Sequence, residues 1–223
     1  MPVQDDSREI EVRNLFGLYK PEGSRADTDA EFVVNGIKIA VELKSTSTVS
    51  ESVTTVRDFS MDHVRKWRHK HWIIGFYDKS GKILKYCKYG SPSDMSNWIE
   101  KMANYIKADI EIAQIAPYLI DKSFLHKILG EKDSYSLADA TGLQKKQYLK
   151  QEYLDLMDKV DGYSDDKMLL ILQDRLKYLI LRGSTLNNPH IPGSYFADWP
   201  KITANHNQIF IARVKEYFQN TPK

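Results

Sequence analysis

The segment around Asn35-Gly36 constrains the fold of this chain more than any other, because it predicts a β-hairpin and fixes its register. Asn-Gly is the preferred pair for a two-residue type I′ turn, and β-branched residues flank it on both sides. Pairing Val34 with Ile37 sets every other pair, and side chains then alternate between the two faces of the sheet. One face is predicted to carry seven apolar side chains: Ala30, Phe32, Val34, Ile37, Ile39, Val41 and Leu43.

The opposite face of this hairpin is charged. It carries Asp27, Asp29, Glu31, Glu42 and Lys44, with Asp29 expected opposite Glu42. Facing Cβ atoms on paired strands lie about 5 Å apart, so two carboxylates there repel each other unless a cation lies between them. Mg²⁺ prefers one or two carboxylates together with water and phosphate oxygens. The sequence therefore predicts a Mg²⁺ site at Asp29 and Glu42, with Lys44 beside it to orient a water molecule or accept its proton.

Asp29, followed by Val41-Glu42-Leu43-Lys44 at the end of an apolar strand, resembles the PD-(D/E)xK motif of type II restriction endonucleases and some repair nucleases. The proline of the motif is absent, because the chain reads Ala26-Asp27-Thr28 before Asp29, and Asp27 therefore remains an alternative to Asp29. The resemblance implies that Asp29, Glu42 and the Leu43 carbonyl hold Mg²⁺, or Mn²⁺ in its place. It also implies DNA hydrolysis, 5′-phosphate products and a homodimer.

A helix is expected before the hairpin, and in this nuclease family such a helix often brings a glutamate to the metal site. Ser7 is suited to cap the helix and Gly17 to end it. Glu9 lies at helical spacing from apolar residues and fits this role, with Glu11 as the alternative. The candidate catalytic residues are therefore Asp29, Glu42, Lys44 and Glu9.

Two segments are candidates for DNA contacts. Residues 57–71 hold five fixed positive charges against two acids, which suits contacts to phosphates, although a solvated helix face explains the pattern equally well. The polar loop 182–195 offers side chains that can contact base edges, although asparagine is also common in ordinary turns. The candidate DNA contacts are Arg57, Arg65, Lys66, Arg68, Lys70, Arg182, Ser184, Thr185, Asn187 and Asn188.

The predicted fold is α/β: a restriction-endonuclease-like core with a mixed central β-sheet flanked by helices, plus a mainly helical C-terminal portion. Strands are expected at 71–77 and 83–89, and the stretch 208–218 fits a helix or a strand. The core is assigned to residues 1–90 and the helical portion to residues 91–223, although one compact domain is also consistent with the sequence. Helical spacing predicts four later helices, at 98–116, 124–129, 143–160 and 165–181.

Composition sets the remaining expectations. A hydrophobic content of 42% and a charged content of 28% are typical of a soluble globular protein, and no apolar run approaches the roughly 20 residues that cross a bilayer. Cys87 is the sole cysteine, so no internal disulfide can form, and the reducing cytoplasm is the expected location. The expected partners are double-stranded DNA and a second copy of the chain, and no membrane.

The sequence thus favours a type II restriction endonuclease, which hydrolyses double-stranded DNA at specific sites with Mg²⁺. The long segment beyond the core, with its candidate readout loop, suits recognition of sequence better than recognition of DNA shape. A structure-specific repair or Holliday-junction nuclease of the same superfamily is the first alternative. A non-catalytic DNA-binding protein with an inert hairpin is the alternative from another class.

Overall fold

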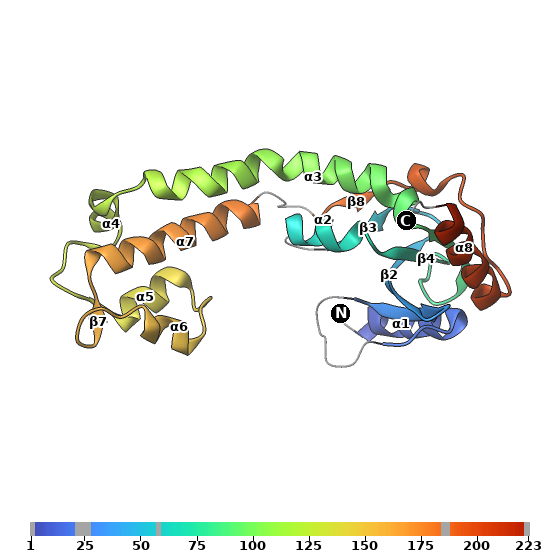
Figure 1. Ribbon diagram of the computed structural model, residues 1–223, viewed down its shortest axis with the longest axis horizontal. Coiled ribbons are helices and arrows are strands. Elements are labelled where there is room, and N and C mark those ends of the chain that lie inside the picture. Colours follow the sequence, from blue (N-terminus) through green and yellow to red (C-terminus); the bar gives the residue numbers. More distant parts are fainter. Residues whose placement is uncertain (1–2, 21–27, 57–58, 184–187, 221–223) are drawn as a thin grey trace. The chain divides into compact units, whose positions relative to one another are not determined.

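The computed structural model of the protein describes residues 3–20, 28–56, 59–183 and 188–220 (Figure 1). The chain divides into two compact units, called here the sheet unit and the helical unit. The sheet unit comprises residues 1–104 and 187–223, and the helical unit comprises residues 105–186. The sequence predicted a boundary near residue 91, whereas the end of the chain belongs with the sheet because its last helix packs on one sheet face.

A four-stranded mixed sheet, in the order β1-β2-β4-β5, forms the sheet unit. β1 (Ala30–Val34) and β2 (Ile37–Ser47) are antiparallel, in the register predicted from the turn. α2 (Met61–Trp67) then connects β2 to β4 (His71–Tyr77), which is parallel to β2. β5 (Leu84–Gly90) returns antiparallel to β4. The predicted α/β class with a mixed central sheet flanked by helices is confirmed.

The turn that sets this register has the expected backbone conformation. Asn35 and Gly36 both have positive φ, 51° and 75°, which a type I′ turn requires at its two central positions. Six of the seven side chains predicted on the apolar face are buried, but Ile37 is 49% exposed. β4 pairs with β2 only from Val41 onward, so Ile37 lies on the part of β2 that extends beyond β4. Ile37 therefore lies on the predicted face, in the predicted register with Val34, but its side chain is not covered at this end of the hairpin.

Two helices cover the apolar face of the sheet: α1 (Val3–Phe16) and α8 (His206–Asn220) (Figure 1). The stretch 208–218, which fitted a helix or a strand, is therefore helical. Gly17 ends α1 with a φ of +65°, a conformation that glycine adopts without steric cost. The core on this face includes Val12 and Phe16 from α1, Val41 and Leu43 from β2, and Phe210 and Val214 from α8.

Aromatic side chains cover the other face of the sheet. The ring of Trp67 in α2 lies 5.3 Å from Phe59 and from Trp72, and 5.6 Å from Trp98, measured between centroids. Trp98 belongs to α3 (Pro92–Ile115), and all four rings are buried. Trp72 stands beside Glu42 in the ladder between β2 and β4. The charged face of the hairpin is therefore partly covered by α2 and α3 instead of lying open to water.

Two further short pieces complete the sheet unit. β3 (Val53–Thr54) pairs with β8 (His190–Ile191), and a turn of 3₁₀-helix, η2 (Gly193–Phe196), follows. The chain between β8 and α8 also touches the sheet, because Cys87 of β5 and Ile202 exchange two backbone hydrogen bonds of 2.9 and 2.8 Å. The C-terminal segment is thus joined to the sheet by backbone pairing as well as by α8.

The helical unit has a core of its own. Its described residues form the later part of α3, the 3₁₀-helix η1, four further helices and one short strand pair, β6 with β7. Buried side chains in this core include Leu125, Tyr135, Tyr163, Met168 and Ile171. The bounds are η1 (Ala116–Leu119), α4 (Lys122–Leu129), β6 (Tyr135–Ser136), α5 (Leu137–Gln144), α6 (Lys150–Asp155), β7 (Gly162–Tyr163) and α7 (Asp165–Gly183).

The single helix predicted over residues 143–160 is wrong. Lys145 and Lys146 have φ values of 53° and 60°, and a left-handed backbone cannot continue a right-handed helix. α5 therefore ends at Gln144, and a separate helix, α6, begins at Lys150. The other three predicted helices are present as α3, α4 and α7, although α3 begins earlier, at Pro92. Among the described residues, no helix has both the length and the apolar character needed to cross a bilayer.

His71 makes the packing of the sheet sensitive to pH. It is 2% exposed, its Nδ1 lies 2.6 Å from the Tyr89 hydroxyl oxygen, and burial lowers its pKa to about 4. An unfolded chain binds a proton at this side chain below about pH 6.5, whereas the folded chain does so only near pH 4. The contribution of His71 to stability is therefore complete above about pH 6.5 and is lost as the pH falls to about 4, by roughly 3 kcal/mol.

This loss is measurable as the difference in free energy of unfolding between pH 7 and pH 4.5, from urea titrations. His71→Phe is expected to make the difference smaller by the part that His71 contributes, because phenylalanine does not titrate. His69→Asn changes an exposed histidine two residues away and should leave the difference intact. An unchanged pH dependence in His71→Phe would contradict the assignment.

Candidate metal centre

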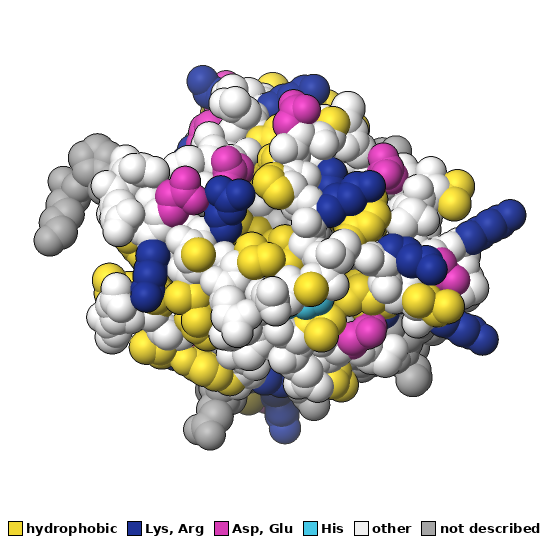
Figure 2. All heavy atoms as spheres, turned by 90° about the vertical axis from the view of Figure 1, so that its right-hand side faces the viewer, with side chains coloured by type: hydrophobic (Ala, Val, Ile, Leu, Met, Phe, Trp, Pro, Cys, Tyr) yellow, Lys and Arg dark blue, Asp and Glu magenta, His cyan; other side chains and the backbone are white. Residues whose placement is uncertain are grey.

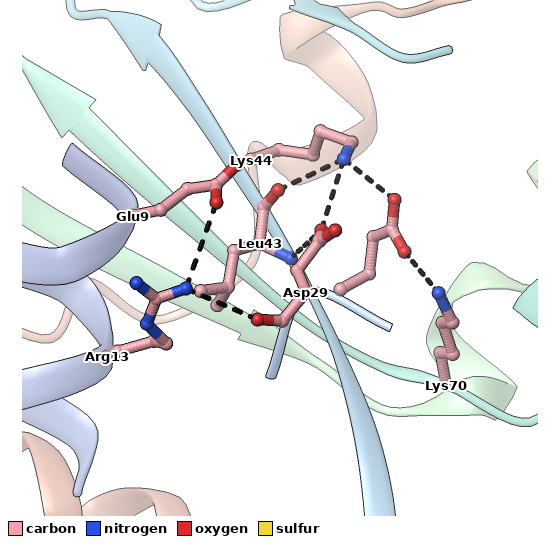
Figure 3. Close-up of polar contacts among 7 residues, drawn as sticks. Glu9, Arg13, Asp29, Leu43, Lys44 and Lys70 are labelled. Atoms are coloured by element: carbon pink, nitrogen blue, oxygen red, sulfur yellow. Dashed lines mark hydrogen bonds and ion pairs between the residues drawn. The ribbon is translucent and has the colours of Figure 1, made fainter. Parts of the chain in front are cut away.

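Three oxygen atoms converge on the ammonium group of Lys44 (Figure 3). Its Nζ lies 2.7 Å from Oε1 of Glu42, 3.1 Å from the carbonyl oxygen of Leu43 and 3.4 Å from Oδ2 of Asp29. The resemblance assigned these same three groups to Mg²⁺. The structure thus brings the predicted ligands around one positively charged atom.

The hairpin and α1 together place Asp29. It precedes β1 and lies outside the ladder, and its carboxylate turns toward β2, where Oδ2 accepts a hydrogen bond of 2.9 Å from the Leu43 amide. Arg13 of α1 donates to the backbone oxygen of Asp29 over 3.4 Å, and the same Nη1 lies 3.9 Å from the Glu9 carboxylate (Figure 3). Asp27, the alternative to Asp29, lies outside the described residues.

Two lysines bind the carboxylate of Glu42, one on each oxygen. Lys44 contacts Oε1 and Lys70 contacts Oε2, each over 2.7 Å, and Glu42 is only 3% exposed. Burial alone would raise the pKa of Glu42, but the two ammonium groups hold it below its ordinary value. Burial alone would lower the pKa of Lys44, but Glu42 and Asp29 raise it. Glu42 is therefore ionised and Lys44 protonated at neutral pH.

The cluster is electrically balanced, since Asp29 and Glu42 face Lys44 and Lys70. A metal ion was expected to offset the repulsion between the carboxylates of Asp29 and Glu42. In the structure the ammonium groups of Lys44 and Lys70 offset it. The oxygen donors are nevertheless of the hard type that Mg²⁺ prefers. Among the described residues, no three His, Cys, Asp or Glu side chains are grouped to hold a metal. A Mg²⁺ ion would therefore use two carboxylates and one carbonyl, with water and substrate oxygens completing its shell.

A pocket of about 380 Å³ adjoins this cluster. Glu9 lines it, whereas Glu11 accepts a hydrogen bond of 2.8 Å from the Tyr77 hydroxyl. Of the two glutamates considered for the metal site, Glu9 is therefore the one that faces the same space as Lys44. The pocket is lined by Arg8, Glu9, Val12, Leu43, Lys44, Ser45, Thr54, Thr55 and Asn188.

The basic segment after the hairpin does not act as one surface. Arg65 and Arg68 are exposed and form ion pairs with Asp62 and Glu100, and Lys66 is exposed as well. Lys70, predicted to contact DNA, is 6% exposed and bound to Glu42, because the chain turns inward between α2 and β4. Lys70 is thus not placed to contact a phosphate. Arg57 lies outside the described residues.

The candidate readout loop is also divided. Arg182 belongs to α7 in the helical unit and donates to the Tyr178 hydroxyl over 2.7 Å, whereas Asn188 lines the pocket in the sheet unit. Part of the remaining loop is regular, since β8 pairs with β3. Ser184, Thr185 and Asn187 lie outside the described residues.

Positive charge does not gather in one place on the face that carries α8. Figure 2 shows Lys and Arg side chains there among acidic and hydrophobic ones. This agrees with the near balance of the whole chain, whose formal net charge is +2. Attraction to DNA on this face would therefore be weak.

Sequence reasoning missed the second lysine of the cluster. Lys70 and Glu42 are 28 residues apart, and their contact follows from the parallel pairing of β2 with β4, which the local pattern did not specify. Arg13 was likewise missed, although its spacing of four residues from Glu9 in a predicted helix was a usable signal.

No protein-family model matches the chain, and no curated protein shows a significant sequence match to it. What the structure establishes is the fold class, an α/β protein with a mixed four-stranded sheet flanked by helices.

Proposed function

We propose that this protein is a Mg²⁺-dependent DNA endonuclease of the PD-(D/E)xK type. The observation that carries the proposal is the convergence of Asp29, Glu42 and the Leu43 carbonyl on one point, which Lys44 occupies. The sheet topology supports the proposal. β2, which carries Glu42 and Lys44, lies inside the sheet between antiparallel β1 and parallel β4. A restriction-endonuclease-like core is consistent with that arrangement.

The proposed chemistry is hydrolysis of a phosphodiester bond. Asp29, Glu42 and the Leu43 carbonyl would hold Mg²⁺, which when bound supplies stabilisation of charge on the phosphoryl oxygens. Lys44 lines the pocket beside these ligands, and its ammonium can donate hydrogen bonds to a water molecule or to a phosphate oxygen there. Glu9, on the same pocket, can accept a hydrogen bond from that water and orient it.

Within this class we propose the activity of a type II restriction endonuclease, a homodimer that cuts double-stranded DNA at a specific sequence. Asn188 supports this specificity, because it lines the same pocket as Lys44 and its amide can form hydrogen bonds to the edge of a base. The helical unit, residues 105–186, offers further surface beyond the site.

A non-catalytic DNA-binding protein is the second candidate, and the balance of charge in the cluster favours it. Two carboxylates that are already neutralised by Lys44 and Lys70 have no need of a metal ion. In that case the cluster would serve only to hold β2, β4 and the segment before β1 together.

Digestion of supercoiled plasmid and phage DNA with Mg²⁺ or Mn²⁺ separates these candidates. The restriction activity predicts discrete fragments, which disappear with a chelator and in Asp29→Ala. Cutting confined to four-way junctions or other branched DNA would indicate a structure-specific nuclease instead. If neither linear nor branched DNA is cut with either metal ion, the nuclease proposal is wrong.

A further inference from the structure

Lys70 and Lys44 bind the same carboxylate but have different surroundings. Lys44 lines the pocket beside Glu42, whereas Lys70 is not among the residues that line it and is 6% exposed. The Lys70 ammonium lies 2.7 Å from Oε2 of Glu42, which is itself 3% exposed. Lys44 therefore has space into which its ammonium can move, and Lys70 is enclosed.

This difference determines which way Glu42 faces. A carboxylate cannot turn about its last bond without breaking a contact that holds one of its oxygens. Because Lys70 holds Oε2, Oε1 is left directed toward Lys44, on the same side as the Leu43 carbonyl and Asp29. The orientation remains if Lys44 moves away.

Lys70 also sets the charge of the site. With both lysines in place the two carboxylates are balanced, and without Lys44 the remaining groups, Asp29, Glu42 and Lys70, carry a net charge of −1. Without Lys70 as well, the charge would be −2. A fixed positive charge close to two metal ligands weakens the binding of a cation between them.

We propose that Lys70 is a positioning residue for the divalent cation. It holds Glu42 so that one oxygen faces the ion, and its fixed charge lowers the affinity of the site for that ion. The inference depends on the proposed function, because it requires a divalent cation between Asp29 and Glu42.

Calorimetric titration with Mn²⁺ tests the role of Lys70 without relying on activity. The wild-type chain is expected to bind one Mn²⁺, and Lys70→Gln to bind it about tenfold or more tightly, because a nearby positive charge is removed. At saturating Mn²⁺ the same variant is expected to cleave DNA about tenfold or more slowly, because Glu42 is no longer fixed. A purely structural lysine would not produce this combination.

Two variants serve as controls. Lys70→Arg keeps the charge and should keep the wild-type affinity for Mn²⁺. Lys38→Gln removes an exposed positive charge from β2, outside the cluster and the candidate DNA contacts, and should change neither affinity nor rate. Thermal unfolding of every variant shows whether it is folded at the temperature of the titration.

The outcomes separate this inference from the proposed function. Equal or weaker Mn²⁺ binding by folded Lys70→Gln overturns the role of Lys70, while Mn²⁺ binding and DNA cleavage by the wild type leave the proposed function standing. If Lys70→Gln does not fold, Lys70→Arg serves as the test variant. An affinity of Lys70→Arg for Mn²⁺ that differs from the wild-type affinity then overturns the inference. A wild-type chain that neither binds Mn²⁺ nor cuts DNA overturns the proposed function itself.

Discussion

Replacing Lys44 with alanine is expected to lower the rate of DNA cleavage by about 10²- to 10⁴-fold, the range typical of a lost proton-transfer or charge-stabilising group. The reason is the position of its ammonium, which contacts both carboxylates and lines the adjoining pocket. The measurement is the single-turnover rate on plasmid DNA at saturating Mg²⁺.

Lys38→Ala is the matched control for this variant. Lys38 lies on the same strand, but its side chain is 63% exposed and pairs with Glu31 away from the cluster. Lys38→Ala should cleave DNA at the wild-type rate. The role given to Lys44 would be wrong if Lys44→Ala retained wild-type cleavage while circular dichroism showed it to be folded.

Replacing Glu42 with alanine is expected to lower the free energy of unfolding by about 3–5 kcal/mol, the cost of leaving a buried charge without its partner. Lys70 is the group left behind, because its ammonium forms an ion pair with Glu42 and its side chain is 7% exposed. Urea denaturation at neutral pH measures this loss.

The surface pair of Glu31 with Lys38 provides the comparison. Glu31→Ala breaks an ion pair whose lysine is exposed, and exposed pairs contribute only about 0–1 kcal/mol. The double variant Glu42→Gln with Lys70→Met removes both buried charges and should recover part of the loss caused by Glu42→Ala. Equal, small losses from Glu42→Ala and Glu31→Ala would show that the buried pair contributes little to stability.

Local signals in the sequence were sufficient to predict the hairpin. Asn35-Gly36 fixed the turn, and alternation from that turn placed Asp29 beside β2 and put Glu42 and Lys44 on one face. Turn type and side-chain alternation depend on neighbouring residues alone, so one sequence is enough to infer them.

The surroundings of that face could not be predicted in the same way. The contact of Lys70 with Glu42 and the covering of this face by Trp67 and Trp98 depend on how separate strands and helices pack. The break after α5 was missed for a related reason. Lys145 and Lys146 adopt a left-handed backbone that their residue type does not favour, so the apolar spacing alone suggested a continuous helix.

The separation of the candidate DNA-contact residues between the two units also depends on how distant parts of the chain pack. Arg182 and Asn188 are close in sequence, yet one belongs to the helical unit and the other lines the pocket of the sheet unit. Residue type alone indicated that each could contact DNA, but it could not indicate which of them lies beside the cluster.

We propose that Asp29, Glu42 and the Leu43 carbonyl form a divalent-cation site from which Lys44 is displaced. The most direct test is a crystal of the protein grown with Mn²⁺ and measured at the manganese absorption edge. We expect one anomalous peak within bonding distance of these three oxygens, with the Lys44 ammonium moved into the adjoining pocket. The claim would be contradicted by a crystal with no peak there at saturating Mn²⁺ and the Lys44 ammonium still between the two carboxylates.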